Sequence, residues 1–253
     1  MKPLRDTVLL FKREFIHSLR NPTWLVVGLM TPLLYLALYT PLLQKLAGGP
    51  GFPTTHVLNV FLPGMIGYMA FMNGVSEGYP TLFNLKDGQI ERFRVTPANR
   101  VALLISPILA DVAWMFVFIV ILIAVAVPFG FNANIPGLLV TLILLGLLVM
   151  VTGAFSVAIA LINKEISSFA AIVNGISLPV LLLSGVLLPL SMAPSWMRVV
   201  AHFNPLYYVV EANRLLAAGD IWNSTVGLAF LVTVGLAVGT FWWATRVFRK
   251  AVA

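Results

Sequence analysis

The chain has 253 residues, of which 60% are hydrophobic and only 10% are charged, and its formal net charge is +7. A soluble domain of this composition would expose too much apolar surface to water, so the composition indicates an integral membrane protein. No soluble basic domain accompanies the positive charge, which therefore indicates attraction to anionic lipid and not to nucleic acid. The absence of cysteine excludes disulfides and zinc-thiolate sites.

The N-terminal tail has the periodicity of an amphipathic helix. Its apolar residues recur at steps of three or four and share one helical face, while the cations fall elsewhere. These apolar residues are Leu4, Val8, Phe11, Phe15 and Leu19. The pattern predicts a helix in the membrane interface over residues 1–22, ended by Asn21 and Pro22. A topology anchor and a helix that contacts a partner protein both fit this pattern.

Six apolar runs follow, and each is long enough to cross a bilayer. A helix that rises about 1.5 Å per residue needs roughly 20 apolar residues to cross about 30 Å of hydrocarbon. The runs cover residues 24–43, 58–83, 101–128, 136–162, 167–189 and 224–247. The sequence therefore predicts an all-α polytopic membrane protein with six transmembrane helices, forming a single domain over residues 1–253.

Basic residues occupy alternate gaps between these runs. They gather in the N-terminal tail, in residues 84–100, beside residue 164 and at the C-terminus. The other gaps hold only Lys45, Arg198 and Arg214. Because cytoplasmic loops carry the excess of Lys and Arg, we expect both termini in the cytoplasm of a cell whose plasma or inner membrane holds the chain.

The segment 84–100 (NLKDGQIERFRVTPANR) is the most charged part of the chain. Asp87 and Gly88 predict a turn, and a short helix follows over 89–95 until Pro97 stops it. Phe93 lies between two arginines, where an exposed ring has no obvious role. This pattern favours docking into a groove of another protein. An ordinary positive-inside loop is the alternative.

Two carboxylates lie within the predicted spans, Glu77 in the second and Asp111 in the third. An isolated carboxylate at the membrane centre costs about 2.5–3.5 kcal/mol, so each is expected to have a protein partner or a wet path. The GxxxG spacings at 74–78 and 235–239 predict close helix packing. Asn73 and Asn174 are milder polar residues that suit hydrogen bonds between helices.

The external segment 189–223 is too long and too apolar for a simple loop. Asn204 and Pro205 form an N-cap and N1 pair, and Gly219 falls where a C-terminal cap belongs, so a helix is expected over 206–217. These half-length helices predict a re-entrant region between the fifth and sixth spans. Glu211 and Arg214 are three residues apart and are expected to form a local ion pair.

The chain lacks the motifs of a motor or an enzyme. It has no GxxxxGK[ST] phosphate loop, and its histidines, His17, His56 and His202, all lie outside the spans. This weakens a metal site or a catalytic Ser-His pair at membrane depth. We therefore expect no catalytic activity, no metal and no cofactor in this chain, and an energy source in another subunit.

These segments, taken in order, resemble the type-2 ABC exporter permeases over essentially the whole chain. The resemblance rests on RNP at 20–22, ERFRVTP at 91–97 and LLPLSMAPSW…FNPLYYVVEANR at 187–214. It implies two permeases, identical or homologous, that pair with two separate ABC ATPase subunits holding ATP and Mg²⁺. The residues implied to couple to the ATPase are Glu91, Arg92, Phe93, Arg94 and Pro97, with Arg13 and Glu14 of the tail.

The resemblance also implies a substrate path between the two permeases and an external gate in the re-entrant region. Candidate path and gate residues are Asn73, Glu77, Asn174, Pro205 and Tyr208. The ERFR…P form looks more like the antibiotic-resistance branch, which implies export of an amphipathic drug or lipid-like molecule. Export of a polysaccharide or lipid-linked glycan, and a membrane docking or sensor protein without transport, are the alternatives. A lipid-modifying enzyme lacks a catalytic set at membrane depth.

Overall fold

The computed structural model describes residues 2–19, 22–44, 57–88, 100–131, 134–187, 190 and 193–252. Every regular element in these ranges is a helix, which confirms the all-α prediction. The elements are α1 (Lys2–Leu19), α2 (Pro22–Gln44), α3 (Val57–Ser76), α4 (Gly78–Lys86), α6 (Arg100–Ala126), η1 (Val127–Phe129), α7 (Ile135–Asn163), α8 (Ile166–Leu183), α9 (Ser195–Ala201), α10 (Pro205–Ala218) and α11 (Ser224–Val252). The predicted helix at 89–95 lies outside the described residues.

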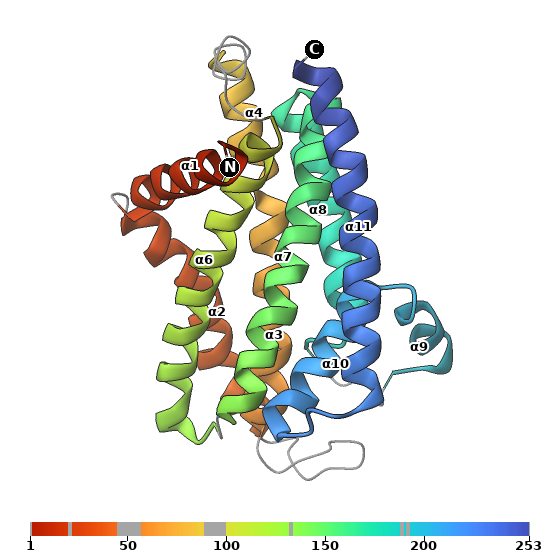
Figure 1. Ribbon diagram of the computed structural model, residues 1–253. Helices are drawn as coiled ribbons and strands as arrows, with labels where there is room; N and C mark the ends of the chain where they lie inside the picture. Colours follow the sequence, from red (N-terminus) through yellow and green to blue (C-terminus); the bar gives the residue numbers. More distant parts are fainter. Residues whose placement is uncertain are drawn as a thin grey trace.

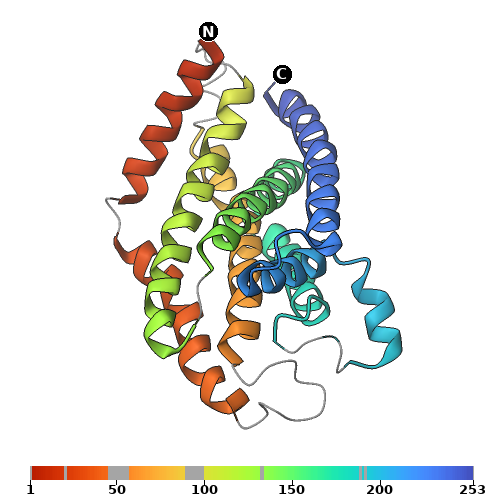
Figure 2. The same cartoon turned by 60° about the horizontal axis from the view of Figure 1, so that its bottom comes forward.

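The long helices α3, α6, α7, α8 and α11 run side by side as a bundle (Figure 1). Both chain termini lie at the same end of this bundle. Helix α1 lies across that end, whereas α10 lies at the opposite end. Helix α9 stands away from the bundle in both views (Figure 1, Figure 2).

Five helical segments of the described chain are long and apolar enough to cross a membrane. They are Leu58–Lys86, Leu104–Phe129, Ile135–Asn163, Ile166–Leu183 and Ser224–Lys250. The first predicted span falls on α2, a helix of 23 residues. Its apolar stretch within the described part, Val26–Leu38, is shorter than a span. The sixth crossing therefore stays a prediction.

Helix α3 lies at the centre of the bundle and contacts α2, α6, α7, α8 and α10. Its buried side chains pack with those of α6, α7 and α10 in one continuous apolar core. Fully buried members of this core include Phe61, Leu62, Met115, Leu144, Leu145 and Leu206. Helices α8 and α11 instead bury only 17% of their most apolar stretch, as expected of helices that face lipid or another subunit.

The helical prediction for the tail is confirmed by α1, although its apolar face is only partly covered. Phe11 and Phe15 are half-buried, whereas Val8 and Leu19 are exposed. The covered part packs against α6. The exposed part leaves apolar surface at the end of the bundle where both termini lie, as an interfacial helix requires.

Helix α3–α4 approaches α7 closely at the predicted glycine pair. A Cβ atom added at Gly74 would lie 2.0 Å from Thr152 Oγ1 of α7, and one added at Gly78 would lie 2.7 Å from Ser156 Oγ of α7 and 2.2 Å from a ring carbon of Phe169 of α8. This confirms close packing for the first GxxxG spacing. The second spacing differs, because Cβ atoms at Gly235 and Gly239 would meet nothing within 4 Å in the described chain.

These two pairs allow a matched test. We expect Gly74→Ala to destabilise the protein by about 1–3 kcal/mol, because its methyl group overlaps α7. Gly239→Ala should be neutral or stabilising by up to about 1 kcal/mol, since alanine favours the helix and meets open space. Thermal unfolding of both variants in detergent measures the difference. Equal unfolding temperatures would show that the α3–α7 approach is unimportant for stability.

Candidate functional site

The second predicted span is broken at Glu77, which forms a turn between α3 and α4. The Glu77 amide donates to the Gly74 carbonyl oxygen at 3.1 Å. Donor and acceptor are three residues apart, as in a 3₁₀ turn, and not four apart as in an α-helix. Ser156 of α7 repairs the break: its hydroxyl donates to the carbonyl of Val75 and accepts from the amide of Gly78 at 2.9 Å. One side chain thus satisfies two backbone groups that have no water to bond at this depth.

The side chain of Glu77 at this break is only 5% exposed. Its carboxyl group lies within hydrogen-bonding reach of the carboxyl group of Asp111 on α6. Of the two environments expected for these residues, a protein partner or a wet path, the structure gives each carboxyl group a protein neighbour, which is the other carboxyl group. The two carboxyl groups therefore form an acidic centre inside the bundle.

Helix α1 reaches this centre through aromatic packing on α6. The ring of Phe15 stacks on Trp114 with 5.1 Å between centroids. Trp114 lies three residues after Asp111, on the same side of α6. Glu14 of α1 interacts electrostatically with Glu77 and forms an ion pair with Arg13, with Nε 3.7 Å from Oε1. The amphipathic helix therefore contacts the element that holds the buried carboxyl pair.

At the opposite end of the bundle, Arg214 of α10 joins three segments of the chain. Its side chain is 11% exposed. Nη1 donates to Glu211 Oε1 at 2.6 Å, Nε donates to the Val60 carbonyl at 3.1 Å, and Nη2 donates to the Gly185 carbonyl at 2.5 Å. Burial lowers the pKa of Arg214 from its ordinary value, and the Glu211 carboxylate opposes this change. The predicted local ion pair is confirmed, but it is part of a wider clamp.

Two asparagines strengthen this clamp. Asn213 Nδ2 donates to the Pro63 carbonyl of α3 at 3.3 Å, and Asn204 Nδ2 donates to the Val180 carbonyl of α8 at 2.8 Å. Asn204 also caps α10, since its Oδ1 accepts from the Leu206 amide at 3.1 Å. The predicted cap of α10 is therefore confirmed, and the same side chain ties α10 to a neighbouring helix.

The predicted gate residues of α10 lie beside this clamp. Pro205 is the first residue of α10, and the Tyr208 hydroxyl donates to the His202 carbonyl at 2.9 Å. At the other end of α10, a Cβ atom added at Gly137 of α7 would lie 1.9 Å from the Leu216 carbonyl oxygen. Helix α10 is thus fixed at its start by side-chain hydrogen bonds and at its end by close backbone approach.

The predicted path residues do not form one cluster. Glu77 lies at the α3–α4 break, whereas Pro205 and Tyr208 lie at the opposite end of the bundle. Asn73 Oδ1 is buried and has no hydrogen-bond partner among the described residues. Asn174 is exposed on α8. The predicted coupling residues Glu91, Arg92, Phe93, Arg94 and Pro97 all lie outside the described residues.

Sequence reasoning missed two residues that organise these sites. Ser156 gives no sequence signal, because serine is ordinary in a membrane helix and its backbone partners lie about 80 positions earlier. Asn213 lies between Glu211 and Arg214, the two members of the predicted ion pair. Its spacing of three from Val210 and Leu216, both buried, places it on the inward face of α10.

The clamp predicts a large effect for Arg214. We expect Arg214→Gln to destabilise the protein by about 1.5–3 kcal/mol, because charge-assisted hydrogen bonds to partly buried acceptors are lost. Arg214→Lys should rescue only part of this loss, since an ammonium group lacks the planar fork that serves three acceptors. Arg198→Gln, at an exposed position on α9, is the matched control and should change stability by less than about 0.5 kcal/mol. Equal unfolding temperatures for Arg214→Gln and Arg198→Gln would contradict the clamp.

Comparison with known proteins is consistent with a transport component. The family model described as "ABC-2 type transporter" matches residues 5–216. A protein named "Putative transport permease ycf38" from Cyanophora paradoxa is 28% identical over 238 residues, covering 93% of this chain and 82% of the relative. Its namesake from Porphyra purpurea is 28% identical over 230 residues, covering 88% and 77%. The chain therefore belongs to the ABC-2 type transporter family, as a membrane permease rather than a catalytic subunit.

Proposed function

We propose that this chain is the permease subunit of an ATP-driven exporter that moves an amphipathic small molecule, a drug or a lipid-like compound, out of the cell. The observation that carries the proposal is the contact of α1 with α6, the helix that provides Asp111 of the buried carboxyl pair. Phe15 stacks on Trp114, and Trp114 shares a helix face with Asp111, which reaches Glu77. In this proposal, a displacement of α1 is passed through α6 to the broken helix α3–α4.

The energy source in this proposal is a pair of separate ABC ATPase subunits, which bind ATP and Mg²⁺. The family supports this partner, because ABC-2 permeases typically work with ABC ATPases, and the chain has no phosphate loop of its own. Arg13 and Glu14 are exposed enough to be reached from outside the bundle, with 56% and 37% of their side chains accessible. Together with residues 91–97, they form the proposed docking surface.

A second permease copy or a homologue completes the path in this proposal. The support comes from α8, a candidate span on which the amide side chain of Asn174 is exposed. A polar side chain within a span rarely faces lipid, so this face suits either a partner helix or a wet path. The apolar exposed residues beside it, Ile176 and Leu178, suit an amphipathic cargo.

The external gate in this proposal is the clamped segment around α10. Arg214 and Asn213 hold α10 against α3, and Asn204 holds its first turn against α8. Release of cargo requires these hydrogen bonds to open or to move as a unit with α3. Helix α3 continues into α4 through the break at Glu77. In this proposal, a movement of α10 at one end of the span therefore also displaces α4 at the other end.

The coupling segment gives the first functional test. We expect Phe93→Ala or Arg92→Glu to lower transport and substrate-stimulated ATP hydrolysis at least about tenfold, because docking energy concentrates in a central aromatic or arginine contact. The measurement uses proteoliposomes that contain the permease and a P-loop ATPase subunit that copurifies with it. Insertion into the membrane should be unchanged.

Phe129→Ala is the matched control, since that ring is 68% exposed and lies in η1, after the end of α6 that is farthest from residue 100. It should leave coupling intact. Unchanged export and ATPase stimulation in both coupling variants would overturn the docking assignment. Failure of any P-loop ATPase to copurify with the chain would favour a docking or sensor protein without transport.

The carboxyl pair gives the second functional test. Glu77→Gln keeps a hydrogen-bonding side chain of the same size beside Asp111 but removes the ionisable group. We expect the initial transport rate to change at least about fivefold while the unfolding temperature stays within about 2 °C, which corresponds to less than roughly 1 kcal/mol. Glu165→Gln, at an exposed position, is the control. Loss of the intact protein in Glu77→Gln would mark the pair as structural.

A further inference from the structure

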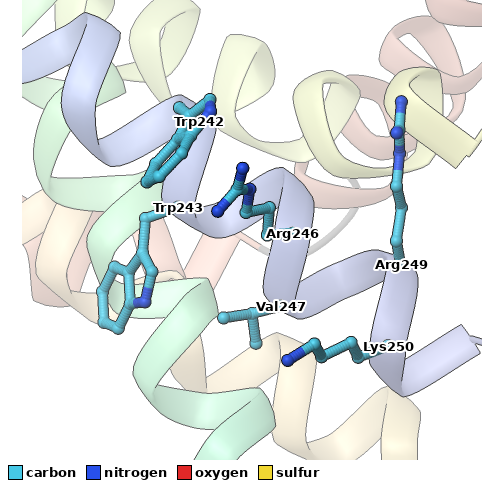
Figure 3. A pocket seen from close by; sticks show the side chains of 6 residues that line it. All are labelled: Trp242, Trp243, Arg246, Val247, Arg249 and Lys250. Atoms are coloured by element: carbon cyan, nitrogen blue, oxygen red, sulfur yellow. The ribbon is translucent and has the colours of Figure 1, made fainter.

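A cavity of about 430 Å³ lies at the end of α11 nearest the C-terminus (Figure 3). Its lining residues are Trp242, Trp243, Arg246, Val247, Arg249 and Lys250. Half of these residues are cations and none is acidic. Among the described residues, no acidic side chain forms an ion pair with any of the three cations. The cavity therefore presents uncompensated positive charge beside two indole rings.

Aromatic contacts hold part of this cavity in place. The guanidinium carbon of Arg246 lies 3.7 Å from the centroid of the Trp242 ring, a cation–π contact. Trp243 packs against Phe155 of α7 with 5.7 Å between ring centroids. In Figure 3, the Arg246 guanidinium lies beside Trp242 and the Lys250 side chain extends towards Val247, while Arg249 extends in a different direction. A pre-placed guanidinium loses less side-chain freedom when it binds an anion.

An apolar surface leads along α11 to these cations. Residues four apart form one row on the helix: Val234, Val238, Trp242, Arg246 and Lys250. Val238 is 69% exposed and Trp242 is 58% exposed, and Arg246 and Lys250 are exposed as well. The row therefore runs from aliphatic side chains through an indole to two cations.

Beside this row, Gly235 and Gly239 leave the helix surface open, since nothing in the described chain lies within 4 Å of a Cβ atom placed there. One turn further along, the next position is Trp243, which lines the cavity. A shallow apolar track thus ends at the positive cavity. Indoles mark the depth of the headgroups in a bilayer, so the track lies at acyl-chain depth and the cations lie at phosphate depth.

We propose that this end of α11 binds one anionic phospholipid, with its phosphate headgroup held by Arg246 and Lys250. One acyl chain lies along Val238 and the open surface at Gly235 and Gly239. Arg249 adds positive charge at the rim. A soluble phosphate compound would gain nothing from the apolar track, and a zwitterionic lipid would gain less from uncompensated cations. The site lies on the exposed face of α11.

The test titrates phosphatidylglycerol into the detergent-purified chain and counts bound lipids by native mass spectrometry, with phosphatidylcholine as the comparison lipid. We expect one phosphatidylglycerol to bind in preference to phosphatidylcholine. A juxtamembrane cation contributes roughly a fivefold preference for an anionic lipid, so the double variant Arg246→Gln/Lys250→Gln should lower this preference about 25-fold. Trp242→Leu keeps every charge but removes the stacked ring, and should lower the preference a few-fold.

Lys86→Gln/Lys164→Gln is the matched control, because it removes the same charge from exposed positions at the same end of the bundle. The preference should survive in this control. An equal loss in both double variants would overturn the proposal in favour of a general surface potential. Displacement of the lipid by glycerol 3-phosphate at equal concentration would overturn it in favour of a soluble phosphate compound. Since all exchanged side chains are exposed, unfolding temperatures should match in both double variants.

Discussion

The hydroxyl group of Ser156 is the contact on which the centre of this structure depends. A helix broken inside hydrocarbon leaves backbone groups that have no water to bond, and each such group costs several kcal/mol. Ser156 accepts from one of these groups and donates to another, so the second span turns at Glu77 without an open backbone. Gly74 and Gly78 make this possible, because any larger residue would hold α7 too far away. The close approach of α3–α4 to α7 is therefore also what allows Ser156 to bond the free backbone groups at the break.

This repaired break explains how a charged residue is accommodated in the middle of the protein. Glu77 sits in the turn, away from lipid, and faces Asp111 of α6. The same stretch of α6 carries Trp114, on which α1 packs. A surface helix, a buried carboxyl pair and a helix break thus lie in direct succession. Movement at any one of them changes the packing of the next, since packed helices move between discrete arrangements.

At the opposite end of the bundle, side-chain hydrogen bonds to backbone carbonyls hold the helices in position. There Arg214, Asn213 and Asn204 donate to backbone carbonyls of α3, α8 and the segment that follows α8. Apolar packing alone would allow α10 to slide along its neighbours, whereas hydrogen bonds to fixed carbonyls set its position. On the outer face of α11, three cations have no acidic partner in the described chain, and apolar side chains beside them are exposed. The three regions therefore differ: the carboxyl pair is buried, α10 is held by hydrogen bonds, and the outer face of α11 is exposed.

The sequence by itself determined the class of the protein, the position of its long helices and the local caps of α10. These features follow from hydrophobic runs and from single-residue backbone preferences, which act over a few positions. The sequence also indicated that Glu77 and Asp111 need partners, but only tertiary structure decided that each partners the other, because they belong to different helices. The two GxxxG pairs likewise show that sequence spacing alone does not determine which helix face packs against a neighbour. Both have the same spacing, yet only Gly74 and Gly78 face another helix of the described chain, since the side of a helix that meets a neighbour depends on the packing of the whole bundle.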